Sequence, residues 1–358
     1  MSPAEITQIR LMNQQIAASN FQSAKDLAAW MGAMQAQDYP MLKWALGVRL
    51  PKSKDKAIEA AMDRGEVLRT HLLRPTWHLV SSDDIYWILE LTAPQIKKAM
   101  NSRHKELELH EAAVSKCNKV ITNALARGEH LTREDLMQLL EQSQISVREN
   151  NRAAHIFALA ELDGLICSGK AKGNKQTYAL LEERVPKKTL LSKEEALGKL
   201  AKQYFLSHGP ATLQDFGWWS GLTISDARNA LEMVKSNFIS ETIDSQIYWF
   251  SDSIRIPKMD EPSVFLLPAF DEYFISYKDR RAILPFEHHT KTVSNNGVFR
   301  PMILFNGQIM GIWKRMVKKE QVLIEFNFFQ SPDENTMELI ERAALEFGDF
   351  LDKKVHLK

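Results

Sequence analysis

The order of elements expected along this chain constrains its fold more than any single motif. The expected elements are helices over residues 4–17, from Ser23 towards Pro40 and from Ser53 to Gly65, then short strands over 66–73 and 76–80. Ser23 is a suitable helix cap, and Arg74-Pro75 between the strands suits a turn. Three helices followed by a strand, a turn and a strand are typical of a winged helix, a relative of the helix-turn-helix.

Two further stretches give the same order. In the first, Thr132 with Asp135 opens a helix, a longer helix follows over residues 147–163, and LICS and QTYAL form a hairpin. In the second, a helix ends at Gly209-Pro210, Thr223 caps a later helix, and FISETI and QIYWF form a hairpin. A repeat of about 80 residues supports tandem winged-helix units more strongly than any one copy does.

From Ile256 onward the chain is rich in β-type segments, with Asn306-Gly307 as a hairpin turn. A helix over 335–351 and a strand over 354–357 are expected to close it. We therefore predict an α+β protein. Its parts would be winged-helix units over residues 1–92, 93–190 and 191–255, with a charged linker over 182–195, and a β-rich C-terminal domain over 256–358.

Composition sets outer limits on the class of protein. The 358 residues suffice for several domains. The chain contains no run of about 18 apolar residues, so no membrane span is expected. The N-terminal segment lacks an apolar signal core, so a cytoplasmic protein is expected. Cys117 and Cys167 are far apart, which fits a reducing compartment. With a net charge of only +1, any nucleic-acid-binding surface must be local.

Motifs for bound ions or nucleotides are weak. Residues 164–171 nearly match a phosphate-binding loop, but the Ser or Thr that would hold magnesium is missing and a helix precedes the segment instead of following it. His104 and His110 lack a third ligand at suitable spacing. We therefore expect no metal, no cofactor and no nucleotide.

The Gln35-Ala36-Gln37 segment is the most interesting candidate for chemistry. The tripeptide alone means little, because Gln142-Ser143-Gln144 has the same pattern. The first copy lies just past a buried helix face, where Pro40 is expected to end the helix. If the segment is extended, both amides face a common space. The alternative is that both amides merely cap a helix end.

Several segments together resemble the AlkZ/YcaQ group of tandem winged-helix DNA glycosylases. These are MQAQDYP, VLRTHLLRPTWHLV, LTAP, LLPAFDEYFISYKDR and IMGIWKR, which follow one another in the family's order over nearly the whole chain. The group carries a Gln-aliphatic-Gln or Gln-aliphatic-Asp motif as its catalytic element. Gln35-Ala36-Gln37 would place this chain in the Gln-x-Gln branch, associated with interstrand crosslinks, although Ala36 is small for the middle position.

The resemblance implies Gln35 and Gln37 as catalytic residues. An amide is neither a useful acid nor a useful base near neutral pH. A purine alkylated at N7 already carries positive charge and leaves easily, so the remaining tasks are to position a water and to stabilise the oxocarbenium-like sugar. Gln37 would position the water and Gln35 would assist it, without metal or a lysine Schiff base.

Basic residues in two regions are candidates for contact with DNA phosphates. They are Arg69, Arg74 and His78 in the first hairpin, and Arg280, Lys314 and Arg315 near the end of the chain. The alternatives are a hydrogen-bonded His78 inside the hairpin and a solvated basic face downstream. Trp77 is expected in the core. Asp271, Glu272 and Tyr277 are expected to fix their loop by hydrogen bonds.

Taken with the resemblance, these features predict a monofunctional glycosylase that hydrolyses the N-glycosidic bond of bulky or cationic N-alkylated purines, including crosslinks. A channel between winged units would hold the duplex without flipping the base into a tight pocket. The partner would be double-stranded DNA carrying alkylated or crosslinked purines, and the protein would act as a monomer. The alternative is a non-catalytic winged-helix protein with a DNA-binding or regulatory role.

Overall fold

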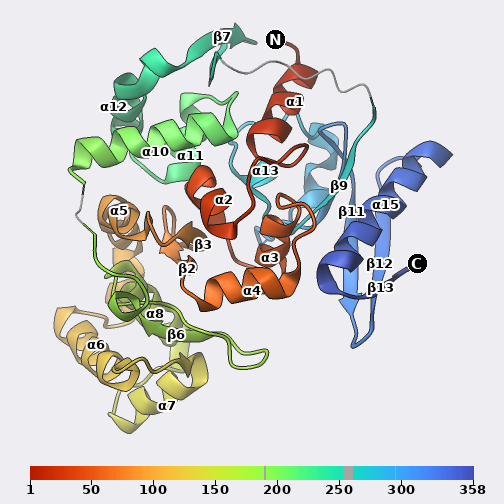
Figure 1. Ribbon diagram of the computed structural model, residues 1–358. Helices are drawn as coiled ribbons and strands as arrows, with labels where there is room; N and C mark the ends of the chain where they lie inside the picture. The colour runs from red at the N-terminus through yellow and green to blue at the C-terminus, as the bar shows by residue number, and fades with distance from the viewer. Residues whose placement is uncertain (189–190, 253–260, 295) are drawn as a thin grey trace.

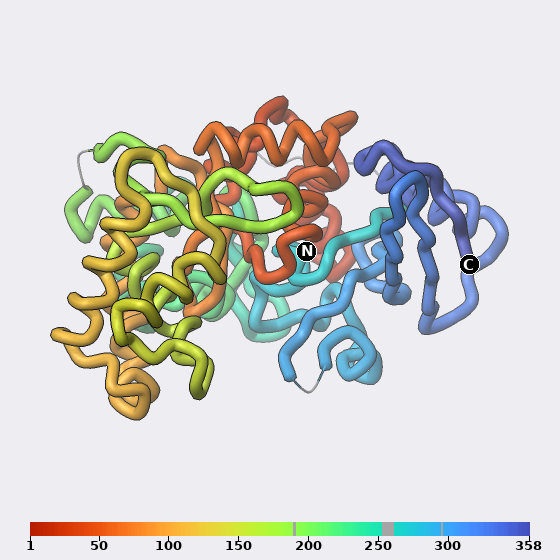
Figure 2. Tube along the Cα trace, turned by 90° about the horizontal axis from the view of Figure 1, so that it is seen from below, coloured from red at the N-terminus to blue at the C-terminus, as the bar shows by residue number. Residues whose placement is uncertain are grey.

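The computed structural model describes residues 1–188, 191–252, 261–294 and 296–358. Helices and strands are mixed along the whole chain, as expected for an α+β protein (Figure 1). Viewed along a second direction, residues of the second unit and the C-terminal strands lie at opposite ends, with the N-terminal residues between them (Figure 2). The predicted boundary between residues 255 and 256 lies outside the described residues.

The first unit contains α1 (Pro3–Asn13), α2 (Ala24–Met31), β1 (Met34–Gln35), α3 (Tyr39–Gly47), α4 (Asp55–Asp63), β2 (Val67–Leu72) and β3 (Thr76–Ser81). Ser23 caps α2 as predicted, but Pro40 does not end that helix. Gly32 ends α2 at a positive φ of 74°, and Pro40 lies in the first turn of α3, with Asp38 as its cap. A proline in the first turn loses no helical hydrogen bond, so it starts a helix as readily as it stops one.

The second unit contains α5 (Ile85–Glu106), α6 (Glu111–Leu125), β4 (Leu131–Thr132), α7 (Arg133–Gln142), α8 (Arg152–Leu162), β5 (Ile166–Ser168), β6 (Thr177–Leu180) and the short α9 (Leu181–Arg184). Helix α5 runs across the predicted boundary at residue 92. The helix expected from residue 147 begins only at Arg152, because Asn150 and Asn151 adopt left-handed φ angles of 52° and 60°. Gly164 follows α8, and β5 then occupies the segment that resembles a phosphate loop.

The third unit follows the predicted order with α10 (Lys193–His208), α11 (Leu213–Ser220), α12 (Ile224–Val234), β7 (Ile239–Ile243) and β8 (Gln246–Phe250). The last part contains β9 (Val264–Leu267), α13 (Glu272–Ile275), α14 (His289–Thr292), β10 (Met302–Phe305), β11 (Gln308–Val317), β12 (Gln321–Phe328), α15 (Glu334–Leu351) and β13 (Lys354–Leu357). Asn306 and Gly307 make the tight turn between β10 and β11, with φ angles of 48° and 83°.

Within the described residues, the C-terminal strands form one five-stranded sheet in the order β13-β12-β11-β10-β9. This sheet shares its core with the first unit, because Ile303, Trp313 and Ile324 belong to the same buried cluster as Leu27 and Trp44. A second buried cluster joins the first unit to the third unit and to the C-terminal part. The consecutive parts read from the sequence therefore do not each have a separate core.

The first hairpin is not a free wing. Every residue of β2 is buried, because this strand packs against α8 and β5 of the second unit. Strand β3 lies in the middle of a small sheet with the order β1-β3-β2. The Gln-x-Gln segment therefore pairs with a hairpin that the second unit encloses. In the part of the chain that the structure describes, no helix is both long and apolar enough to cross a membrane.

Candidate active site

The Gln-x-Gln segment forms the edge of the first sheet. Gln35 pairs with His78 of β3, and the Ala36 N–H donates to the Trp77 carbonyl at 2.7 Å. The Ala36 side chain is buried, whereas Gln35 and Gln37 are both partly exposed. Because side chains alternate along an extended chain, Gln35 and Gln37 project on the same side, opposite to Ala36.

Both amide oxygens have fixed donors. Arg74 Nη2 lies 3.0 Å from Gln35 Oε1, and the Trp77 N–H donates to Gln37 Oε1 at 3.3 Å. These donors decide which end of each amide is the oxygen. Each carbonyl oxygen keeps a second lone pair for a further donor such as water. Neither amide caps a helix, because α2 ends at Gly32 and Asp38 caps α3.

Two predicted DNA-binding arginines meet at an exposed indole. The Arg280 guanidinium lies 5.7 Å from the centre of the Trp218 ring, and the Arg74 guanidinium lies 6.0 Å from it. Trp218 is 44% exposed. Burial lowers the pKa of Arg74, and burial together with the nearby charge of Arg74 lowers the pKa of Arg280 to about 10. Both remain cationic at neutral pH and lie over an aromatic ring that is partly exposed.

Arg69 lies behind the motif. Its Nε donates to the Ala36 carbonyl at 2.8 Å, Nη1 donates to Gln176 Oε1 at 3.0 Å, and its guanidinium lies 4.2 Å above the Trp77 ring. Trp77 itself packs against the core shared with the C-terminal sheet. Arg69 is only 9% exposed, so in this structure it supports the backbone of the Gln-x-Gln segment and does not present a charge to DNA.

His78 is fully buried and lies opposite Gln35 on the neighbouring strand. Its Nδ1 lies 3.0 Å from the Thr76 carbonyl, which makes Nδ1 the protonated nitrogen. Burial, with the charge of Arg74, lowers the pKa of His78 to about 3. A neutral histidine enclosed in this way matches the alternative of a hydrogen-bonded His78, and in this structure it offers no charge to a phosphate.

The end of β11 approaches the motif from the C-terminal sheet. Arg315 Nη2 lies 3.9 Å from Asp38 Oδ1, one residue beyond Gln37. Lys314 is exposed, as are Met316, Val317, Lys318 and Lys319 at the end of this strand. Arg74 thus lies at Gln35, with Arg280 close by at Trp218, and Arg315 lies near Asp38. Lys314 precedes Arg315 in β11, so its side chain projects to the other face of the sheet.

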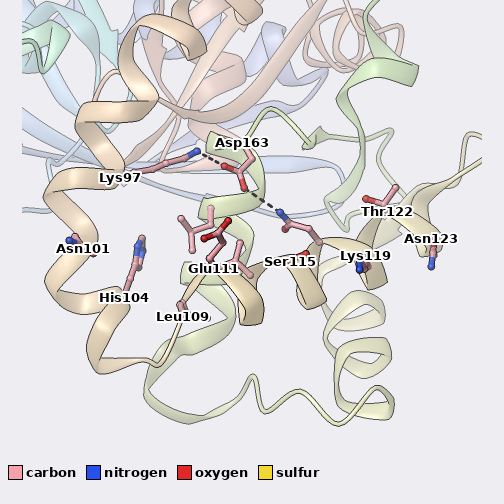
Figure 3. Close-up of a pocket in the computed structure, with 13 residues that line it drawn as sticks. Lys97, Asn101, His104, Leu109, Glu111, Ser115, Lys119, Thr122, Asn123 and Asp163 are labelled. Atoms are coloured by element: carbon pink, nitrogen blue, oxygen red, sulfur yellow. Dashed lines mark hydrogen bonds and ion pairs between the residues drawn. The ribbon is translucent and has the colours of Figure 1, made fainter.

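The surface has a hollow next to the motif and a larger groove away from it. The hollow, of about 350 Å³, lies behind the motif and is lined by Arg69, Trp77 and Glu161 among others. The larger groove, of about 650 Å³, runs between α5 and α6 and is lined by both polar and apolar side chains (Figure 3). There Lys97 and Asn118 both contact Asp163, and none of the motif residues takes part. Among the described residues, no group of three or more His, Cys, Asp or Glu side chains could hold a metal ion.

Sequence reasoning missed two contributors to the site. Trp218 belongs to no motif in the sequence, and Glu272 is expected only to fix its own loop. Asp271 and Tyr277 do fix that loop, since Asp271 forms an ion pair with Arg49 and Tyr277 donates to the His208 carbonyl at 2.7 Å. Glu272 in addition accepts the Gln35 N–H, across 237 residues of sequence. No local pattern signals a contact at that separation.

Comparison with known proteins gives consistent results. A family model described as "DNA glycosylase AlkZ-like" matches residues 28–350. The interstrand DNA cross-link repair glycosylase of Streptomyces sahachiroi is 22% identical over 332 residues, which cover 88% of each chain. The solved structure of the Streptomyces sahachiroi DNA glycosylase AlkZ matches with a TM-score of 0.80 over 100% of both chains, at 16% identity. That likeness shows a common fold.

Proposed function

Because this chain belongs to the AlkZ-like DNA glycosylase family, we propose that it removes bulky or cationic N-alkylated purines from duplex DNA, including purines joined in interstrand crosslinks. The relative from Streptomyces sahachiroi carries the name of a cross-link repair glycosylase, which supports the crosslink part of the proposal. The geometry around Gln35 and Gln37 supports the chemical part.

The reaction is hydrolysis of the bond between the sugar C1′ and the purine nitrogen. Water oxygen forms a bond to C1′, and the base leaves with the electron pair of the broken bond, which neutralises its positive charge. The water proton passes to solvent. Because the leaving group is already cationic, the site needs no general acid. It needs a positioned water and dipoles that stabilise the oxocarbenium-like sugar.

The observation that carries this proposal is the fixed orientation of the two amide oxygens on one sheet edge. Gln37 Oε1 is held by the Trp77 N–H and has a lone pair left to accept a hydrogen from the attacking water. Gln35 Oε1, held by Arg74, supplies a second oriented dipole. A non-catalytic DNA-binding protein needs basic side chains but has no need for two oriented amides between them.

The duplex would lie across the motif, in contact with the cations near it. Arg280 and the exposed Trp218 lie beside Arg74, and Arg315 approaches Asp38 from β11, with Lys314 exposed on the same strand. Contacts from such side chains position the phosphate backbone without reading sequence. All of these groups come from one chain, which supports action as a monomer.

The test is incubation of the protein with duplex DNA that contains N7-methylguanine, and separately with a nitrogen-mustard crosslink. We expect abasic sites that break only after alkali treatment, since no Schiff base cleaves the strand. The Gln37→Ala variant should bind the same DNA and release no base. Binding by the wild-type protein with no product from either substrate would instead support the non-catalytic alternative.

A further inference from the structure

We propose that Glu272 is a positioning residue for Gln35, and that its carboxylate fixes the motif backbone and offsets the charge of Arg74 beside the reacting sugar. This inference rests on the proposed glycosylase function and adds to it a residue from a distant part of the chain.

The first step of the argument concerns the sheet edge. Strand β1 is only two residues long, and among the strands that the structure describes it pairs with β3 alone. Since the Ala36 N–H points towards β3, the N–H of the preceding Gln35 points outward from the sheet. Glu272 Oε1 accepts that outward N–H at 2.5 Å. The carboxylate therefore takes the place of a neighbouring strand and holds a short edge segment that otherwise has few hydrogen bonds.

The second step concerns how Glu272 itself is held. Its Oε2 accepts from the Trp219 indole N–H at 3.2 Å and from the Ser276 hydroxyl, and His208 Nε2 lies 3.7 Å away. The side chain is only 1% exposed. These neighbours come from α10, α11 and the segment after α13, so the carboxylate has little freedom to move. A rigid support of this kind is what holds a catalytic group within a fraction of an ångström of its working position.

The third step concerns charge. Burial by itself would raise the pKa of Glu272, but the neighbouring His208, the Ser276 hydroxyl and the charge of Arg74 hold it below its usual range, so the group is ionised. Arg74 donates to Gln35 Oε1, which places a guanidinium next to the site where the sugar becomes cationic. An unopposed cation there would disfavour the transition state. The Glu272 charge offsets that of Arg74 and leaves Gln35 with an oriented dipole.

The decisive variant is Glu272→Gln, which keeps the size and one acceptor oxygen but removes the charge. We expect its single-turnover excision of N7-methylguanine to be on the order of 100-fold slower, with unchanged affinity for DNA. The matched control is Asp84→Asn. Asp84 is also a buried carboxylate that accepts an indole N–H, from Trp87, but it has no contact with the motif. It should keep the wild-type rate per folded molecule.

A second variant keeps the inference testable if Glu272→Gln does not fold. Glu272→Asp keeps the charge but withdraws it from the Gln35 N–H, so it should also slow excision, though less than Glu272→Gln. In the Arg74→Gln background, Glu272→Gln should cost much less than in the wild-type protein, because the cation that the carboxylate offsets is gone. Full additivity of the two losses would overturn the inference.

The outcomes separate the inference from the function on which it rests. If the wild-type protein releases no alkylated base, the proposed function fails and the inference fails with it. If the wild-type protein is active and both folded Glu272 variants excise within about twofold of its rate, the inference alone is overturned. Equally slow excision by Glu272→Gln and Asp84→Asn would also overturn it, since the loss of any buried carboxylate would then slow the reaction.

Discussion

The buried His78 makes a quantitative prediction about stability and pH. In an unfolded chain a histidine has a pKa of about 6.5. In the folded protein burial, followed by the charge of Arg74, lowers the pKa of His78 to about 3. Between these two values the unfolded state binds a proton that the folded state does not bind. The free energy of unfolding therefore decreases as the pH falls, by about 1.4 kcal/mol per pH unit within this window.

The variant that isolates this effect is His78→Asn, whose side-chain amide can still donate to the Thr76 carbonyl in place of Nδ1. From about pH 7 to about pH 5, the His78 contribution to unfolding free energy amounts to roughly 2 kcal/mol. Other buried histidines also destabilise the wild-type protein at acid pH, so the relevant quantity is the difference in pH dependence between the two proteins. Urea unfolding followed by circular dichroism gives it directly.

The matched control replaces the exposed His356 by Asn, which removes a histidine that is not enclosed. We expect it to lose as much stability as the wild-type protein when the pH is lowered, whereas His78→Asn should lose about 2 kcal/mol less. Equal losses in His78→Asn and in the wild-type protein would show that His78 is not a buried neutral histidine. The burial of the first hairpin against the second unit would then be wrong.

Three further predictions follow from buried and exposed groups. Asp271→Ala should cost about 3–5 kcal/mol in denaturant unfolding, because it leaves the fully buried Arg49 without its carboxylate, and a loss below about 1 kcal/mol would contradict this. Lys314→Ala should reduce the slope of log affinity against log salt by about one in an anisotropy titration with duplex DNA, and an unchanged slope would exclude a phosphate contact. Cys117 and Cys167 are buried, and burial raises the pKa of Cys167 to about 12, so neither should react with a thiol reagent until the protein unfolds; rapid labelling of the native protein would contradict their burial.

Local signals predicted most elements of the fold. The capping pair of Thr132 and Asp135, the cap at Thr223 and the Asn306-Gly307 turn each specify a conformation within a few residues. Helix α3 could not be read in this way. Its sequence YPMLKWALG is buried on nearly all sides, so it lacks the polar face that makes helical periodicity visible.

The site was predictable only in part. The positions of Gln35 and Gln37 on one side of an extended segment follow from alternation alone, and their partial exposure agrees with it. The enclosure of Arg69 and His78 does not follow from the hairpin sequence, because it depends on the second unit packing against β2. The contact between Glu272 and Gln35 likewise exists only in the folded chain.

The most direct measurement of the central claim compares the two Gln-x-Gln segments of this chain under single-turnover conditions. The double variant Gln35→Ala/Gln37→Ala should excise N7-methylguanine at least 100-fold more slowly than the wild-type protein, on the order of what the loss of an oriented dipole costs other enzymes, with DNA affinity retained. The double variant Gln142→Ala/Gln144→Ala, at the exposed end of α7, should keep the wild-type rate. Wild-type excision by the first double variant would contradict the assignment of these two amides as the catalytic groups.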